Sequence, residues 1–235
     1  MPNILTYADD TNLLVPCNTD VQIDAEFDNI QTWAVANKMT INVAKTKEIV
    51  FRRPSARCTT VLPPMLPCTE RVKSAKLLGV FITDNLKFGD HVNYVLQRSC
   101  QRLYLLKLLR CQGLSLHNLS IVCVALLISR LTYAISAWGG FCSASDVGRI
   151  NSFLKRVVKY GFLTECSDFN SYLDQADLKL FKRMCHSDHC LHMLLPALKP
   201  TVCQKLRRRT HVYTLPKCRY ELFKKSFVLR CLYNF

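Results

Sequence analysis

The residues best suited to chemistry are two adjacent carboxylates near the start of the chain, in the run Tyr7-Ala8-Asp9-Asp10. The flanking segments, Ile4 to Tyr7 and Leu13 to Val15, are rich in strand formers, whereas Asp is common in turns and rare in strands. This order predicts a β-hairpin with both aspartates at its tip. Neighbouring carboxylates repel each other unless a cation lies between them, and Mg²⁺ prefers such oxygen ligands. Asp9 and Asp10 are therefore candidate metal ligands and catalytic residues, with an ordinary polar hairpin as the alternative.

Charge is distributed unevenly along the chain. The net charge is +15, yet residues 1–50 contain three Lys and seven acidic residues, whereas the remainder contains 29 basic and 10 acidic residues. A basic body beside an acidic tip suits a polyanion such as nucleic acid, because Lys and Arg neutralise phosphates. An apolar content of 49% is enough to bury a core, which excludes a disordered tail.

Membrane insertion and secretion are not favoured by the sequence. The longest apolar stretch, Leu119 to Trp138, is interrupted by Arg130, which favours a buried core helix over a membrane span. The N-terminus has no basic region followed by a clean apolar stretch, so we expect no secretory signal. The 13 cysteines are odd in number, scattered and never spaced Cys-x-x-Cys. Free thiols in a reducing compartment, cytoplasmic or nuclear, are the expectation.

One short segment is dense in residues that can bind metals. It contains Cys185, His186, His189, Cys190 and His192. Zinc favours Cys and His, but this spacing fits no common zinc finger. The run from His186 to Asp188 also matches the first two ligands of an iron(II) facial triad, without further support. The alternative is a turn between helices with polar histidines at the surface.

Short elements are expected in the first third of the chain. Asp20 can cap a helix with apolar positions from Val21 to Ala34, which would cover one face of the hairpin. Proline residues between Arg52 and Cys68 predict a loop or a pair of edge strands. Three further segments are predicted to be extended: Met39 to Val43, Glu48 to Phe51, and Lys76 to Ile82, the last as one buried strand.

The rest of the chain has mostly helical periodicity. An apolar stripe starts at His91 and continues to about Arg110, with Arg98 and Arg102 interspersed. Three more helices are predicted, over Leu116 to Trp138, Asp146 to Tyr160, and Ala176 to Met184. The fold class is therefore α+β, with strands early and helices late.

The C-terminal segment combines cations with aromatic residues. Ten basic residues and one acidic residue lie between Lys199 and Phe235. Such a mixture can follow a phosphate backbone and stack bases, and a solvated basic face over a small aromatic core is the alternative. The candidate nucleic-acid-binding residues are Arg98, Arg102, Arg207, Arg208, Arg209, Lys224 and Lys225.

Taken together, these residues resemble the reverse transcriptases of non-LTR (LINE-type) retrotransposons. The run Tyr7-Ala8-Asp9-Asp10-Thr11 is similar to the catalytic hairpin of the family's palm, and Trp33 to Phe51, with Lys45-Thr46-Lys47, to the next palm motif. Leu78 to Asp84 is similar to the segment that closes the palm. The helices around Leu103 to Leu109 and Leu131 to Gly140 resemble the thumb. The end of such reading frames is resembled by His189 to Pro196, Pro216, Arg219 and Lys225 to Asn234. The resemblance depends on the order and spacing of these motifs.

The resemblance implies an RNA-directed DNA polymerase that uses an RNA template, a DNA primer and Mg²⁺. Asp9 would be the principal ligand of two metal ions and Asp10 an auxiliary ligand, while Lys45 or Lys47 would act on the departing pyrophosphate. It also implies three parts: a partial palm over residues 1–85, a helical thumb-like region over 86–162 and a basic C-terminal segment over 163–235.

Activity of this chain alone is not expected. A polymerase of this family needs another palm aspartate and fingers upstream of the hairpin, and this chain starts six residues before Tyr7. We therefore expect weak or no metal binding and no turnover without a partner. A nucleic-acid-binding module without chemistry is the alternative, and a chain that folds poorly because its hairpin is an exposed sheet edge is a third possibility.

Overall fold

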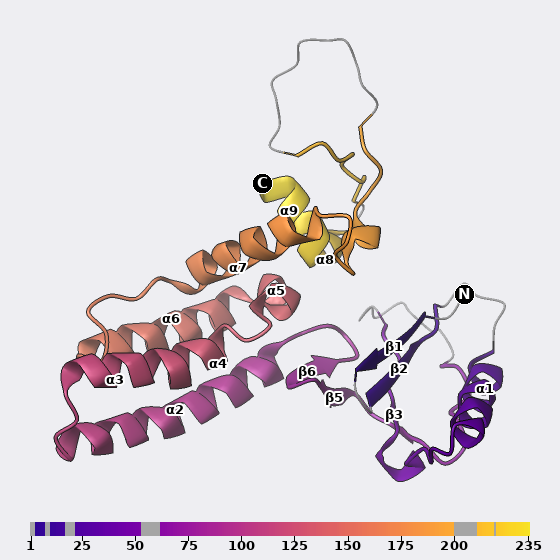
Figure 1. Ribbon diagram of the computed structural model, residues 1–235, viewed down its shortest axis with the longest axis horizontal. Helices are drawn as coiled ribbons and strands as arrows, with labels where there is room; N and C mark the ends of the chain where they lie inside the picture. The colour runs from indigo at the N-terminus through magenta and orange to yellow at the C-terminus, as the bar shows by residue number, and fades with distance from the viewer. Residues whose placement is uncertain (1–2, 8–9, 17–21, 53–61, 200–210, 219) are drawn as a thin grey trace. The chain divides into compact units, whose positions relative to one another are not determined.

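The computed structural model describes residues 3–7, 10–16, 22–52, 62–199, 211–218 and 220–235. These residues divide into two compact units, the first formed by residues 1–75 and 83–85 and the second by residues 76–82 and 86–235. Strands and helices are both present, and most helices belong to the second unit (Figure 1). The α+β class is therefore confirmed. The regions expected to form a thumb and a separate C-terminal segment lie in the same unit.

The first unit contains short strands and one regular helix. Its elements are β1 (Asn3–Tyr7), β2 (Asp10–Leu14), α1 (Ile23–Ala36), the 3₁₀ turn η1 (Val43–Lys45), β3 (Lys47–Glu48) and β4 (Glu70–Arg71). The partial palm is expected to contain a hairpin, a helix and a few antiparallel strands; β1 and β2 do pair antiparallel, whereas β3 and β4 pair in parallel. The residue that caps α1 is Gln22, and the expected cap Asp20 lies outside the described residues.

Apolar side chains of the first unit remain largely exposed. On β1, Ile4 is 50% exposed and Tyr7 65% exposed, and on α1 Trp33 is 57% exposed. The apolar face of α1 buries only Ala34 fully. A two-stranded sheet has too little surface to bury both its own faces and a helix, so this unit has a small core.

A buried ion pair organises the centre of the first unit. Arg71 donates from Nε and Nη2 to the two carboxylate oxygens of Glu48, at 3.1 and 2.8 Å. The same guanidinium donates to the carbonyls of Pro63 and Pro64 at 2.8 and 3.0 Å. Glu48 is 8% exposed, so the pair links β3, β4 and the proline-containing segment away from water.

The expected single strand from Lys76 to Ile82 is instead a hairpin. It is formed by β5 (Ser74–Leu77) and β6 (Val80–Thr83), and Leu78 and Gly79 between them have φ of 45° and 89°. Two consecutive positive φ values are what a tight two-residue hairpin turn requires. Leu78 is an unusual residue for this conformation, so the apolar run from Lys76 to Ile82 did not indicate a turn.

Helices make up nearly all of the second unit. The bounds are α2 (Gly89–Cys111), α3 (Leu116–Cys123), the π-helical segment η2 (Val124–Ile128), α4 (Ser129–Leu131), α5 (Ile135–Trp138), the 3₁₀ turn η3 (Gly139–Phe141), α6 (Ala144–Lys159), α7 (Phe169–Met184), the 3₁₀ turn η4 (His192–Leu194), α8 (Glu221–Lys224) and α9 (Phe227–Asn234). Ser143 and Asp146 form a capping box, so α6 begins two residues before the expected start. Asp168 caps α7, which starts seven residues earlier than expected.

The expected continuous helix from Leu116 to Trp138 is divided. A π-helical segment interrupts it, and a turn at Ala134, with φ of 50°, precedes α5. Of the described residues, the run Leu116–Phe141 is the one long and apolar enough to cross a membrane, and 33% of its most apolar 18-residue stretch is buried. A core helix meets the same criteria, so a single run of this kind is weak evidence for a membrane span.

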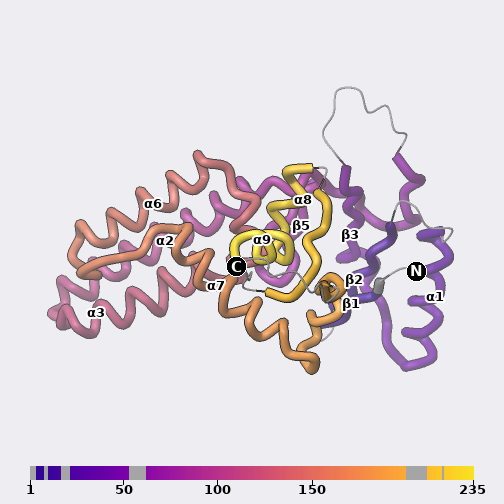
Figure 2. The backbone as a smooth tube through the Cα atoms, turned by 90° about the horizontal axis from the view of Figure 1, so that it is seen from above, coloured from indigo at the N-terminus to yellow at the C-terminus, as the bar shows by residue number. Residues whose placement is uncertain are grey.

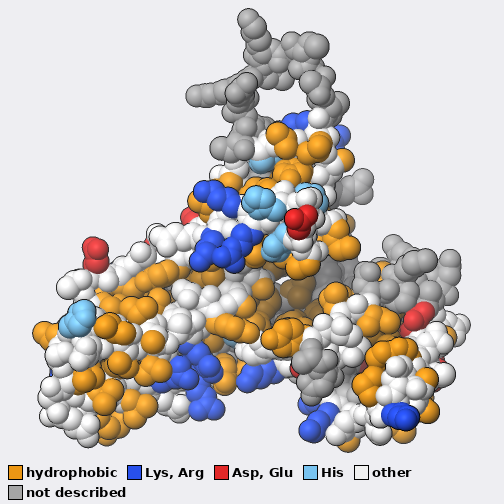
Figure 3. All heavy atoms as spheres, viewed as in Figure 1, with side chains coloured by type: hydrophobic (Ala, Val, Ile, Leu, Met, Phe, Trp, Pro, Cys, Tyr) orange, Lys and Arg blue, Asp and Glu red, His pale blue; other side chains and the backbone are white. Residues whose placement is uncertain are grey.

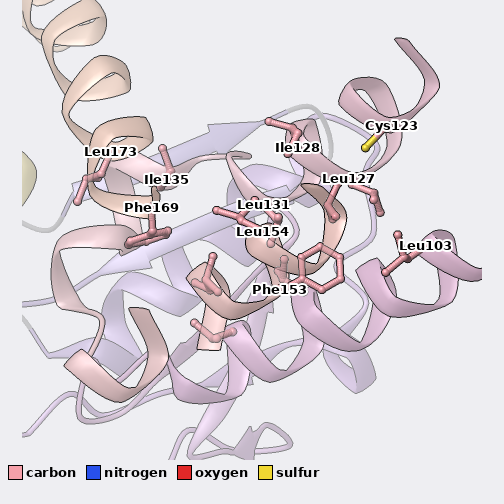
Figure 4. Packing of buried hydrophobic residues seen from close by; sticks show 14 of the residues in the cluster. Leu103, Cys123, Leu127, Ile128, Leu131, Ile135, Phe153, Leu154, Phe169 and Leu173 are labelled. Carbon is pink, nitrogen blue, oxygen red and sulfur yellow. The ribbon is translucent and has the colours of Figure 1, made fainter. Parts of the chain in front are cut away.

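The main core lies between α2, the run α3 to α4, and α6, which lie side by side in Figures 1 and 2. Figure 4 shows Leu103, Leu131 and Phe153 pointing into this core from three different helices. Trp138 is fully buried at one end, and its indole Nε1 donates to the carbonyl of Tyr133 at 2.9 Å. Each large side chain buried here contributes roughly 1.5–3 kcal/mol, which makes this unit the stable part of the protein.

A second small core joins α7 to the C-terminal helix α9. Inside it, Arg230 donates from Nε to Asp177 Oδ2 at 2.6 Å and from Nη2 to Asp177 Oδ1 at 3.1 Å. The same side chain donates to the carbonyls of Ser136, at 2.9 Å, and Lys225, at 2.5 Å. The Asp177 and Arg230 side chains are 1% and 11% exposed. This cluster holds α9 against α7 and α5.

Two glycines explain how the chain approaches this cluster. A Cβ on Gly140 would lie 1.8 Å from Nη1 of Arg230 and 2.6 Å from the carbonyl oxygen of Lys225. A Cβ on Gly139 would lie 2.9 Å from Leu173 Cδ1. Both positions require glycine, because the Arg230 guanidinium and α7 occupy the space that a side chain would need.

Replacing Arg230 with Met tests the buried pair. The variant leaves Asp177 buried without its partner, so we expect a loss of about 3–5 kcal/mol in the free energy of unfolding, measured by urea denaturation. The matched control is Lys224→Met, which removes the exposed ion pair with Glu221 and should leave the midpoint nearly unchanged. Equal midpoints for both variants would show that the Asp177 pair is not structural.

Two glycine substitutions of opposite expected sign test the packing. Gly140→Ala should destabilise the protein by about 1–3 kcal/mol, because the new methyl group meets Arg230 and a carbonyl oxygen. Gly148→Ala meets nothing within 4 Å on α6 and should stabilise by about 0.5–1 kcal/mol through helix propensity. Thermal melting of the two variants measures the difference, and two similar shifts would contradict the close approach at Gly140.

Candidate nucleic-acid interface

The aspartate hairpin is present, with one of its two carboxylates described. Tyr7 lies directly opposite Asp10 in the β1–β2 register, so the chain reverses between these two residues, as the sequence predicts. Asp10 opens β2 and is exposed. Asp9 lies outside the described residues.

A magnesium ion is implied by the family resemblance, and Asp10 is the one of its two predicted ligands that the structure describes. Mg²⁺ needs an octahedron of oxygens, to which Asp10 can contribute its carboxylate. Across the described ranges, no group of three or more His, Cys, Asp or Glu side chains is arranged to hold a metal ion. Metal binding at Asp9 and Asp10 therefore stays a prediction.

The two candidate lysines of the first unit are at its surface. Lys45 ends η1 and is exposed, and its backbone N–H is bound by Asn42 Oδ1 at 3.2 Å. Lys47 lies on β3, and its Nζ is 3.4 Å from a carboxylate oxygen of Glu70. Within the described residues neither lysine is hydrogen-bonded or ion-paired to Asp10. Their roles in catalysis stay predictions.

The segment rich in Cys and His folds as a series of turns after α7. His189 Nδ1 accepts the backbone N–H of Leu191 at 3.2 Å, and His192 Nδ1 is 3.0 Å from the carbonyl of Met184. These bonds use the histidines to hold local turns, which agrees with the alternative interpretation of this segment. The ten described cysteines are free thiols, and burial raises the pKa of Cys231 to about 12, so this thiol is protonated and unreactive.

Three cations converge on one tyrosine in the second unit. Lys76 Nζ and Arg130 Nη2 lie 3.4 and 3.2 Å from the hydroxyl oxygen of Tyr94. Lys76 Nζ and the Arg98 Cζ lie 5.0 and 5.7 Å from the centre of its ring. The hydrogen bond from Lys76, and the field of both Lys76 and Arg130, lower the pKa of Tyr94. The ring of Phe81 packs edge-on against Tyr94 at 5.1 Å. We call Lys76, Tyr94, Arg98 and Arg130 the Tyr94 cluster.

The Tyr94 cluster contains cations without acidic partners. In the described part of the chain, none of Lys76, Arg98 and Arg130 lies within ion-pair distance of a carboxylate. Figure 3 shows Lys and Arg side chains gathered over α2 and over α7 on the face in view. Sequence reasoning found Arg98 and missed the other three members. The signal for Arg130 was present, since a lone charge inside an apolar helical run needs a reason to be there.

The other predicted α2 cation has a structural contact. Arg102 Nη1 donates to the carbonyl of Leu126 in η2 at 2.9 Å. A π-helical segment disturbs the regular helix hydrogen bonds, and this arginine binds a carbonyl there. Arg102 therefore ties α2 to the segment that leads into Arg130.

A second group of cations surrounds Tyr160 at the end of α6. Lys107 Nζ lies 3.9 Å from the centre of the Tyr160 ring, and Arg110 donates to the Tyr160 carbonyl at 2.7 Å. A hollow of about 370 Å³ nearby is lined by Ser152, Lys155, Arg156, Lys159 and Tyr160. Cations at the end of a helix also stabilise its dipole, so this group has a structural role independent of any ligand.

The predicted C-terminal binding residues are only partly described. Arg207, Arg208 and Arg209 lie outside the described residues. Lys224 pairs with Glu221 at 2.7 Å, and Lys225 is exposed. Of the aromatic residues in this segment, Tyr213 is 8% exposed within the small C-terminal core, whereas Phe223 is 54% exposed. The aromatic-core alternative therefore holds for Tyr213, and Phe223 remains at the surface.

A neutral histidine lies behind the Tyr94 cluster. His91 is 2% exposed, packs edge-on against Trp138 at 4.8 Å, and accepts the Phe81 N–H on Nδ1 at 3.3 Å. Burial, with the charges of Arg130 and Lys76, lowers its pKa to about 4. The structure therefore requires the unprotonated imidazole.

Stability should consequently fall in mild acid. Because the folded pKa of His91 lies near 4 and its ordinary value is 6.5, the stabilisation is complete above pH 6.5 and is lost as pH falls toward 4. The loss should reach about 3 kcal/mol. Urea titrations from pH 7 to pH 4 measure it, and His91→Asn, whose amide oxygen can still accept a hydrogen bond, should have a flatter profile. Parallel profiles would exclude His91 as the cause.

Comparisons of the chain with models of known protein families, with curated proteins and with solved structures find no match. The likeness to non-LTR reverse transcriptases therefore rests on the residues of this chain.

Proposed function

We propose that this chain is a palm-and-thumb portion of a non-LTR-type RNA-directed DNA polymerase, and that the property it keeps on its own is nucleic-acid binding. The observation that carries the proposal is the Tyr94 cluster, where three cations meet without an acidic partner among the described residues. Phosphates of an RNA template or DNA primer supply the missing negative charge.

Two further features support binding by the second unit. The excess of positive charge lies after residue 50, where the chain has 29 basic and 10 acidic residues. The described cations there contact aromatic rings: Lys107 lies over Tyr160, and Arg110 lies 5.1 Å from the centre of Phe162. Such contacts hold long side chains in place while their charges stay available to a polyanion.

The first unit supports the proposal that polymerisation is absent without a partner. Strands β1 and β2 form a two-stranded sheet, and Ile4 and Leu5 are 50% and 56% exposed. An isolated hairpin is marginally stable in water. Phosphoryl transfer depends on precise positioning of carboxylates and metal ions, which a hairpin whose described apolar side chains are half exposed does not provide.

Binding is tested by a salt titration of the purified chain with a labelled single-stranded oligonucleotide. If about three phosphates are neutralised, affinity for this single strand should fall roughly 20-fold between about 50 and 200 mM salt. Neutralising Arg207, Arg208 and Arg209 to Gln should reduce both the affinity and the slope of its salt dependence. An affinity that does not change with salt would refute binding through phosphates.

Catalysis is tested with the same preparation by primer extension on an RNA template with Mg²⁺. We expect no extension above background. Extension that depends on Asp9 or Asp10, measured by their replacement with Asn, would overturn the proposal of a non-catalytic chain. It would then identify the aspartates as metal ligands of a working polymerase.

A further inference from the structure

The Tyr94 cluster is built from three elements that are distant in sequence. Lys76 comes from β5, Tyr94 and Arg98 from α2, and Arg130 from α4. Bringing three positive charges together is unfavourable unless an anion neutralises them. Because they are brought together by the packed helical unit, the repulsion persists in the folded protein until an anion binds.

The position of Arg130 depends on an irregular helix. Arg130 is the second residue after η2, the π-helical segment Val124–Ile128. An inserted π turn rotates the residues that follow it relative to a regular α-helix, and such segments are frequent at functional sites. Arg102 binds the carbonyl of Leu126 within η2, at 2.9 Å. Arg102 is therefore a positioning residue for Arg130.

The hydroxyl group of Tyr94 is set up as a donor. A tyrosine hydroxyl has two acceptor sites and one hydrogen. Its oxygen accepts one hydrogen bond from Lys76, at 3.4 Å, and one from Arg130, at 3.2 Å. With both acceptor sites used, the hydroxyl group can still donate its own hydrogen to a further acceptor. A ligand bound here meets one O–H donor and three cations.

The ligand that fits best is a phosphate group. Arginine guanidinium groups match phosphate oxygens with paired donors, and Lys adds a compact positive charge. Bases are a poor match, because Lys76, Arg98 and Arg130 all lie within 6 Å of the Tyr94 ring centre and occupy the surroundings that a stacked base would need. Recognition at this cluster is therefore independent of base sequence.

We infer that Lys76, Tyr94, Arg98 and Arg130 form a phosphate-binding site that takes one backbone phosphodiester of a nucleic acid without reading its sequence. The assignment of the phosphate to a nucleic acid rests on the proposed function. The site itself rests on the contacts of the four residues.

The test compares two double variants with the same loss of charge. Lys76→Gln/Arg98→Gln removes two exposed cations of the cluster, and Lys179→Gln/Lys182→Gln removes two exposed cations of α7. Binding of two oligonucleotides of unrelated sequence is measured over a salt series. We expect the cluster variant to lose roughly tenfold in affinity on both sequences and to reduce the salt slope by about 0.7, the value for one phosphate of a single strand, and the α7 variant to change both far less.

Two outcomes would overturn the site. Equal losses in both double variants would show that only total charge matters, and if the parent chain binds with a steep salt slope this result leaves the proposed function standing. A loss confined to one oligonucleotide would show that bases are read.

A second ligand separates the site from the function. Inorganic phosphate is titrated into the parent chain while the ionisation of Tyr94 is followed by ultraviolet absorbance, with Tyr94→Phe as the blank. We expect phosphate to raise the pKa of Tyr94 toward its ordinary value, because the anion offsets the field of Lys76 and Arg130. If this occurs in a chain that binds no oligonucleotide, the phosphate site stands and the proposed function fails.

The variants are chosen to remain informative if one of them does not fold. Lys76 and Arg98 are exposed, and a cluster double variant that loses cooperative melting is replaced by Tyr94→Phe, which removes only the hydroxyl group. This substitution should weaken oligonucleotide binding on both sequences without changing the salt slope, since it removes a donor and no charge. Unchanged affinity in Tyr94→Phe would remove the tyrosine from the site.

Discussion

A buried pair of opposite charges, Arg230 and Asp177, holds the C-terminal helix to the rest of the helical unit. The chain has a net charge of +15, so a basic C-terminal segment is repelled by a basic body. The buried carboxylate of Asp177 on α7 offsets this repulsion by pairing with Arg230. Arg230 also donates to the carbonyls of Ser136 and Lys225, so few of its donors are unsatisfied. Gly140 gives the guanidinium the space to reach them.

The two units differ in how well their apolar side chains are covered. In the second unit, Trp138 and Leu106 are fully buried among helices, whereas in the first unit Tyr7 and Trp33 remain more than half exposed. A surface that must hold a polyanion in one geometry benefits from rigid support. The helical unit provides such support to the Tyr94 cluster, and the hairpin that carries Asp10 has much less of it.

The cations of the helical unit act on residues behind the surface as well. Arg130 and Lys76 lie close enough to His91 to help lower its pKa to about 4, after burial, the largest cause. The same two side chains lower the pKa of Tyr94. Surface charge and core ionisation are therefore coupled, and an anion at the Tyr94 cluster would change both.

Local patterns in the sequence were sufficient for the hairpin that pairs Tyr7 with Asp10, for the periodicity of α2 and α6, and for the uneven charge, because each depends on neighbouring residues. They did not predict the turn between β5 and β6, because Leu78 adopts a positive φ there and leucine is not a typical turn residue. The Tyr94 cluster could be found only from the tertiary structure. Like charges avoid each other in a flexible chain, and only the packing of β5, α2 and α4 brings them to one tyrosine.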